Sequence, residues 1–117
     1  MYKETIIPQK SNTATVIVTY NPDKDFAANL LQAHAITDLV VVVDNGSQNL
    51  SFVRESVRAA GTELIALDEN RGIAAALNIG IRRALDAGKE WILASSWYVR
   101  FLSSSLGHLP GSRISGA

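Results

Sequence analysis

The chain has 117 residues, 47% of them hydrophobic, and its 11 lysines and arginines balance 11 aspartates and glutamates. This length and composition fit one globular domain, and a net charge of zero argues against nucleic-acid binding through phosphates, which needs a basic excess. The lack of cysteine excludes disulfides, thiolate zinc sites and cysteine nucleophiles. With neither a signal-peptide core nor a run of about 20 apolar residues, the sequence predicts a cytoplasmic protein, leaving contact with the inner face of the membrane open.

The first half of the chain alternates strand-like and helix-like segments. Residues 13–20 (TATVIVTY) are mostly β-branched or aromatic, which favours a strand. Asn21 and Pro22 suit the N-cap and first position of a helix, so we expect a helix to begin there. Residues 39–43 are continuously apolar, as in a strand buried on both faces. A turn cluster, DNGS, follows at 44–47.

The second half repeats the alternation. Apolar positions between 52 and 60 predict a second helix that stops near Gly61, and residues 63–67 predict a third strand. A third helix is indicated by an apolar stripe at four-residue spacing: Ile73, Leu77, Ile81 and Leu85. Residues 91–93 begin a fourth strand. The pattern predicts an α/β fold, a Rossmann-like parallel sheet with flanking helices.

The last part of the chain differs in character. Residues 94–117 contain seven serines and neither Asp nor Glu, and no helical or alternating period persists through them. We therefore expect residues 1–93 to form the α/β domain and residues 94–117 to be an irregular tail. The tail is either an ordinary serine-rich extension or non-native sequence, and the residues favour neither reading.

Parallel sheets bind ligands at the carboxyl ends of their strands, so the turns are the candidate sites. At the end of the first strand, the ring of Tyr20 can stack on a planar base and the hydroxyl of Thr19 can bond its edge. The carboxylate of Asp44 only accepts hydrogen bonds and suits a pyrimidine imide N–H or a ribose hydroxyl. A purely structural reading explains the same residues. Tyr20 would then be an aromatic strand end followed by a helix cap, and residues 44–47 would be a turn with Ser47 or Asn49 capping the next helix.

The third turn opens the third helix with Asn70, Arg71 and Gly72. A helix N-terminus favours anions, and Arg71 adds a cation suited to phosphate or carboxylate. Asn78, inside the helix, needs a polar partner, which a neighbouring loop would supply. The two histidines have no metal-like spacing, and neither the Walker A nor the G-x-G-x-x-G pattern is present.

In this order and spacing, four segments resemble family 2 glycosyltransferases of the GT-A fold: residues 18–21 (VTYN), 41–47 (VVVDNGS), 70–80 (NRGIAAALNIG) and 91–93 (WIL). The sequences of these segments are most similar to those of bacterial rhamnosyltransferases, which use dTDP-rhamnose to build surface polysaccharides. The resemblance implies an N-terminal fragment, the nucleotide-binding half of a GT-A enzyme. It also implies a dTDP- or UDP-sugar donor and a polysaccharide or lipid-linked acceptor.

The resemblance also implies roles for individual residues. Thr19 and Tyr20 would line the base pocket, and Asp44 would hydrogen-bond the pyrimidine. The remaining candidates would shape these loops or lie near the nucleotide or the sugar: Asn21, Asn45, Ser47, Asn70, Gly72 and Asn78.

The chain departs from the family at the fourth strand, where an Asp-x-Asp motif should hold Mg²⁺ or Mn²⁺ on the donor diphosphate. Leu93 is followed instead by ASSW. The acceptor-binding half and the carboxylate base are also missing. We therefore expect no catalytic residue, no well-bound metal and no sugar transfer by this chain alone, and an exposed sheet edge would favour self-association. The alternatives are a non-catalytic nucleotide-binding or receiver-like α/β module and a fragment without any ligand.

Overall fold

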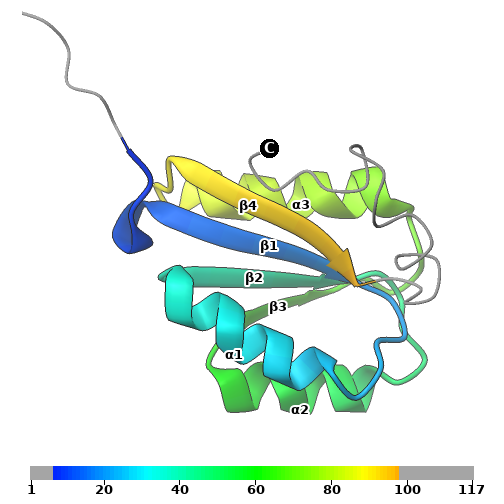
Figure 1. Ribbon diagram of the computed structural model, residues 1–117. Helices are drawn as coiled ribbons and strands as arrows, with labels where there is room; N and C mark the ends of the chain where they lie inside the picture. The colour runs from blue at the N-terminus through cyan, green and yellow to red at the C-terminus, as the bar shows by residue number, and fades with distance from the viewer. Residues whose placement is uncertain (1–6, 98–117) are drawn as a thin grey trace, which may run out of the picture.

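The computed structural model describes residues 7–97, which form a sheet of four parallel strands with helices on both faces (Figure 1). The elements in chain order are η1 (Lys10–Asn12), β1 (Thr13–Thr19), α1 (Phe26–Ile36), β2 (Leu39–Asp44), α2 (Leu50–Ala60), β3 (Glu63–Ala66), α3 (Ile73–Asp86) and β4 (Trp91–Trp97). The strand order is β3-β2-β1-β4, and each pairing is parallel. The predicted α/β fold with a parallel sheet is confirmed. Within residues 7–97, no helix is long and apolar enough to cross a membrane.

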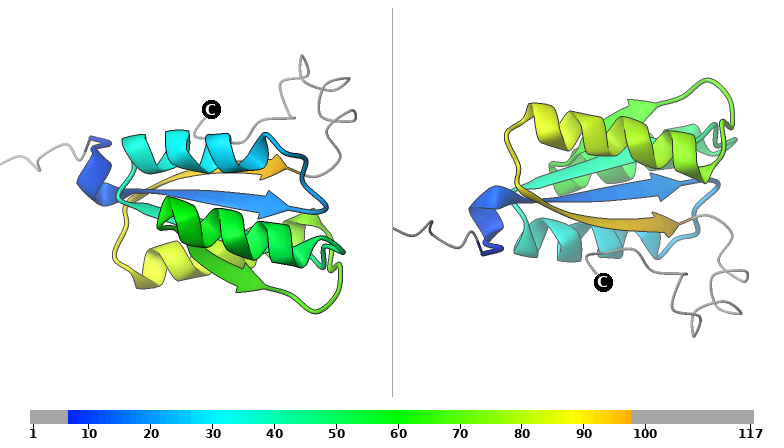
Figure 2. Two further views of the ribbon diagram at one scale, coloured as in Figure 1. Left: turned by 90° about the horizontal axis from the view of Figure 1, so that it is seen from below. Right: turned by 90° about the horizontal axis from the view of Figure 1, so that it is seen from above.

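The sheet lies between two helical layers, α1 and α2 on one face and α3 on the other (Figure 2). Because β1 pairs on both edges and is covered on both faces, all seven of its residues are buried. On the α1 and α2 face, the core is built from Phe26, Leu30, Val53 and Val57 against Ile17 and the alternate valines of β2. Each fully buried aliphatic or aromatic side chain of this kind contributes about 1.5–3 kcal/mol.

Helix α3 lies close against the sheet at Gly80, and its buried face carries mostly small residues. A Cβ atom built on Gly80 would lie 2.3 Å from Cγ1 of Val16, so only glycine fits there. Arg83 adds an ion pair to β3, with Nε 2.8 Å from Oε1 of Glu63 and Nη2 2.9 Å from Oε2. The hydrogen bonds to Glu63, and then its charge, raise the pKa of Arg83 above its ordinary value. These contacts hold the C-terminal half of α3 against the sheet.

The predicted apolar stripe on α3 is wrong at both ends. Ile73 and Leu85 are 41% and 55% exposed, whereas the buried face consists of Ala76, Leu77, Gly80 and Ala84. A helix advances about 100° per residue, so a four-residue spacing drifts about 40° per step and about 120° over twelve residues. A stripe at that spacing cannot stay over one groove of the sheet along the whole helix.

The first helix begins later than predicted. Residue 22 is not its first position, because α1 starts at Phe26 and Asp25 occupies its N-cap position. Asn21 instead adopts a left-handed conformation, with φ of 49°. Its side-chain oxygen accepts a hydrogen bond from the loop that follows β2.

Strand β4 extends further than predicted, through Trp97, so residues 94–97 are not irregular. Ala94 is buried and pairs with Val16 of β1, so the central strand sets the extent of β4 despite its serines. The rest of the predicted tail, residues 98–117, lies outside the described residues, and the predicted domain boundary is otherwise untested.

Candidate functional site

Three loops meet at the carboxyl edge of the sheet, where the strands end together (Figure 1). The first loop (residues 20–25) follows β1, the second loop (residues 45–49) follows β2 and the third loop (residues 67–72) follows β3. Thr19 pairs with Asp44, and Asp44 with Ala66, so the loops start at one level of the sheet. This edge is where open parallel sheets bind ligands.

The first and second loops are joined by a chain of hydrogen bonds that ends on a carboxylate. The backbone N–H of Asn21 donates to Oγ of Ser47 (2.7 Å), and that hydroxyl donates to Oδ1 of Asp44 (2.5 Å). The backbone N–H of Ser47 donates to Oδ2 of Asp44 (2.9 Å), and the backbone N–H of Gln48 donates to Oδ1 of Asn21 (2.8 Å). Because Asn21 contributes an N–H donor, the Ser47 proton must point towards the carboxylate.

A further contact between these loops was not expected from the sequence. Asn49 occupies the N-cap position of α2 but makes no capping hydrogen bond, and Ser47 is engaged elsewhere. The predicted capping by either side chain is therefore wrong. Nδ2 of Asn49 instead donates to the carbonyl oxygen of Pro22 (3.0 Å). The number of asparagines in the three loops could have indicated such contacts, because an amide side chain both donates and accepts hydrogen bonds.

The second and third loops are joined through the side chain of Asn45. Its Oδ1 accepts the backbone N–H of Arg71 (2.8 Å), and its Nδ2 donates to Oδ1 of Asn70 (3.2 Å). That same Asn70 oxygen accepts the backbone N–H of Gly72 (2.9 Å) at the start of α3. The backbone N–H of Asn45 donates to the carbonyl oxygen of Thr19 (2.8 Å), so this residue contacts all three segments.

The second and third loops also touch at Gly46. It has a φ of 88°, and a Cβ atom built there would lie 2.8 Å from the carbonyl carbon of Glu69 and 2.9 Å from the nitrogen of Asn70. Only glycine allows both this backbone conformation and this approach. The two backbones are therefore in direct contact beside the Asn45 side chain.

The predicted site residues divide into a buried layer and a surface layer. Thr19, Asp44 and Asn45 are fully buried, and the surface above them is formed by five others. Tyr20 and Ser47 are half-buried, whereas Asn21, Asn70 and Gly72 are exposed.

Asn78, within α3, takes no part in these hydrogen bonds. It is exposed on α3, where it lines a shallow depression of about 280 Å³ with Ile79 and Arg82. Solvent can satisfy its amide there, so the loop partner expected for it is not needed.

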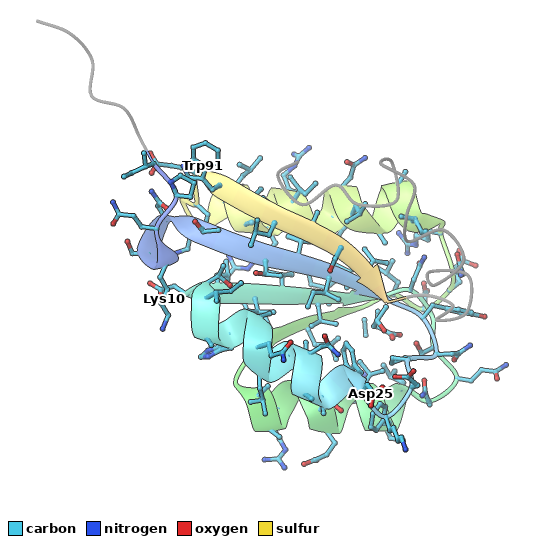
Figure 3. All side chains as sticks on the ribbon, in the orientation of Figure 1. Lys10, Asp25 and Trp91 are labelled. Atoms are coloured by element: carbon cyan, nitrogen blue, oxygen red, sulfur yellow. The ribbon has the colours of Figure 1, made fainter. Side chains whose placement is uncertain are left out.

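The opposite edge of the sheet carries a separate cavity of about 370 Å³ between η1, the end of α1 and β4. Lys10 and Trp91 lie at this amino edge, whereas Asp25 lies at the other, beside the three loops (Figure 3). The exposed apolar surface here comes mainly from Ile36 and Trp91, at 60% and 40% exposure. Its lining is largely aliphatic and aromatic, unlike the asparagine-rich carboxyl edge.

The residues at the carboxyl edge do not fit a divalent-cation site. Within residues 7–97 no three His, Asp or Glu side chains converge as metal ligands would. β4 ends in ASSW, and the buried carboxylate of Asp44 already accepts two hydrogen bonds from Ser47. Hard cations need several oxygen ligands with negative charge among them, which the described residues of this edge do not assemble.

An α/β domain with a polar site at the carboxyl edge of a parallel sheet is the class that the geometry defines. The family model for glycosyl transferase family 2 matches residues 15–94, which include all three loops, and the chain belongs to this family. It is 42% identical over 84 residues to the dTDP-rhamnosyl transferase RfbF of Shigella flexneri. That match covers 71% of this chain and 28% of the relative, so the chain spans less than a third of that protein. No solved structure matches the chain.

Proposed function

We propose that the carboxyl edge of the sheet binds the pyrimidine nucleotide of a dTDP- or UDP-sugar in a glycosyltransferase. The transferred sugar, for which rhamnose is the candidate, would go to a polysaccharide or lipid-linked acceptor. The observation that carries the proposal is the set of hydrogen bonds that joins the three loops around Asp44 and Asn45. Membership of the family, and similarity to a protein named for dTDP-rhamnosyl transfer, support the same function.

The first two loops form the base-binding end of this proposed site. The half-buried ring of Tyr20 supplies a surface on which a base stacks, worth about 1–3 kcal/mol per base. A carboxylate has about four lone-pair positions, and Ser47 occupies two on Asp44, which leaves acceptors for an imide N–H. Because Asp44 is fully buried, the residues that cover it must move aside as the base enters.

The third loop forms the diphosphate-binding end. The N-terminus of α3 favours an anion, and Arg71, which is exposed beside Asp68, brings a guanidinium to the same place. No residue of this chain is assigned a catalytic role, because serine hydroxyls on β4 cannot supply the charge of two carboxylates. We therefore propose that the chain binds the nucleotide but does not transfer the sugar by itself.

Calorimetry with dTDP, UDP and ADP, each with and without Mn²⁺, tests this function. We expect dTDP or UDP to bind in preference to ADP, and Mn²⁺ to change the affinity little. Asp44→Asn keeps the shape of the side chain but replaces one acceptor with a donor, so the preference for pyrimidines should fall. Equal binding of ADP and dTDP, or no binding of any nucleotide, would contradict the proposal.

A receiver-like domain is disfavoured, since it needs several carboxylates converging on Mg²⁺, a cluster that residues 7–97 do not contain. A cytoplasmic location, and self-association through the edge of the sheet, stay predictions.

A further inference from the structure

We propose that Asn45 is a positioning residue that holds the diphosphate-binding end of the site in register with the base-binding end, without touching the nucleotide. This inference rests on the proposed function. It adds a specific coupling: the side chain of one buried asparagine sets the distance between the two ends.

The side chain of Asn45 is placed for an indirect role. It is as fully buried as Asp44, so burial alone does not separate it from a ligand; the difference is that its amide is engaged by the third loop. Both polar atoms of its amide face the third loop, Oδ1 towards the N–H of Arg71 and Nδ2 towards Oδ1 of Asn70. Its own backbone N–H is held by the carbonyl oxygen of Thr19 at the end of the central strand.

The contacts of Asn45 fix the beginning of α3. Oδ1 of Asn70, which accepts a hydrogen bond from Nδ2 of Asn45, also accepts one from the N–H of Gly72. The carbonyl oxygen of Gly72 in turn accepts the N–H of Ala76 in the first helical turn. A continuous path of hydrogen bonds therefore runs from β1 and β2 to the first turn of α3. Arg71, whose N–H lies on this path, carries the guanidinium assigned to the diphosphate.

The base-binding end does not depend on this path. Ser47 and Asn21 hold Asp44 through hydrogen bonds that involve neither the Asn45 side chain nor the third loop. Loss of the Asn45 amide should therefore loosen the third loop, which then keeps its contact with Gly46, while the first two loops stay joined. The two ends of the site are separable by a single substitution.

The test measures the advantage that the diphosphate gives to binding. Dissociation constants for thymidine and for dTDP are obtained by NMR titration of the wild type, Asn45→Ala and Asn12→Ala. Asn12 is the matched control, because its amide also holds a loop, through Ile7 and Gln9, but at the opposite edge. We expect Asn45→Ala to weaken dTDP binding by between about twofold and thirtyfold, the range for residues that act indirectly. Its thymidine affinity, and both affinities of Asn12→Ala, should stay within twofold of the wild type.

Each other outcome bears on a different claim. If Asn45→Ala weakens thymidine and dTDP equally, or neither, the coupling is wrong although the proposed function stands. If the wild type binds neither compound, the proposed function fails first.

A ligand-free measurement guards against a variant that does not fold. Amide exchange at Arg71 and Gly72 should be slow in the wild type and Asn12→Ala and fast in Asn45→Ala. Asn45→Asp keeps an acceptor for Arg71 but loses the donor to Asn70, so exchange should accelerate mainly at Gly72. Unchanged exchange at both amides in Asn45→Asp would overturn the proposal.

Discussion

The two edges of the sheet are built by different means. At the amino edge, loops are held largely through backbone groups: the N–H of Asp38 donates to the carbonyl oxygen of Lys10, and that of Glu90 to the carbonyl oxygen of Asn12. At the carboxyl edge, many hydrogen bonds between loops involve side chains of asparagine and serine, and their partners are more than 20 residues away in sequence. Backbone contacts survive most substitutions, whereas side-chain contacts do not. The geometry of the carboxyl edge is therefore set by residue identity.

The largest expected contrast between the edges comes from glycine. Gly46→Ala combines a strained backbone, about 1–3 kcal/mol, with a clash against the third loop, about 1–3 kcal/mol, so stability should fall by about 2–6 kcal/mol. Gly88→Ala, at the amino edge, has a similar φ of 84° but nothing within 4 Å of the new Cβ, so only the strain remains. Urea unfolding of both variants measures the difference. Equal losses would show that the loops at the carboxyl edge separate easily.

A smaller effect is expected from the hydroxyl that joins the first and second loops. Ser47→Ala removes a hydrogen bond to a carboxylate and the acceptor of the Asn21 N–H, which should cost about 1–3 kcal/mol. Ser51→Ala, on the exposed first turn of α2, is the control and should change stability by less than about 0.5 kcal/mol. Chemical denaturation gives both values. A neutral Ser47→Ala would mean that water replaces the hydroxyl and that Asp44 is not held by it.

The smallest effect belongs to the amino edge. Nζ of Lys89 donates to the carbonyl oxygen of Ser11 at an exposed position, so Lys89→Ala should shift stability by no more than about 0.5 kcal/mol. Thermal unfolding measures the shift against the wild type. A loss as large as that of Ser47→Ala would remove the contrast between the edges.

The fold, and the position of the candidate residues at one edge of the sheet, could be predicted from the sequence because both depend on strong local patterns. Continuous apolar runs marked the strands, and a parallel sheet brings the residues that follow its strands to one edge. Thr19, Asp44 and Asn45 could therefore be placed without any knowledge of contacts.

The contacts between loops could not be predicted, because a local pattern has two explanations. Asn21 before Pro22 is typical of a helix start, yet its amide serves the second loop 27 residues later. Asn49 likewise resembled a helix cap and instead contacts Pro22. The length of β4 was also hidden, since Ser95 and Ser96 have no strand preference and are held in the strand by pairing with β1.

The strand order has a consequence for the way the chain is synthesised. β1 is the first strand to leave the ribosome and becomes the central one, but its second neighbour, β4, pairs with it only after residue 91 has been made. At about 5–20 residues per second, the edge of β1 that pairs with β4 therefore stays unpaired for several seconds after its other edge has paired with β2. During this interval the nascent chain exposes one edge of a β-branched strand, which is buried in the folded domain, and other chains can pair with that edge. A pause in translation before β4 has left the ribosome would lengthen that exposure.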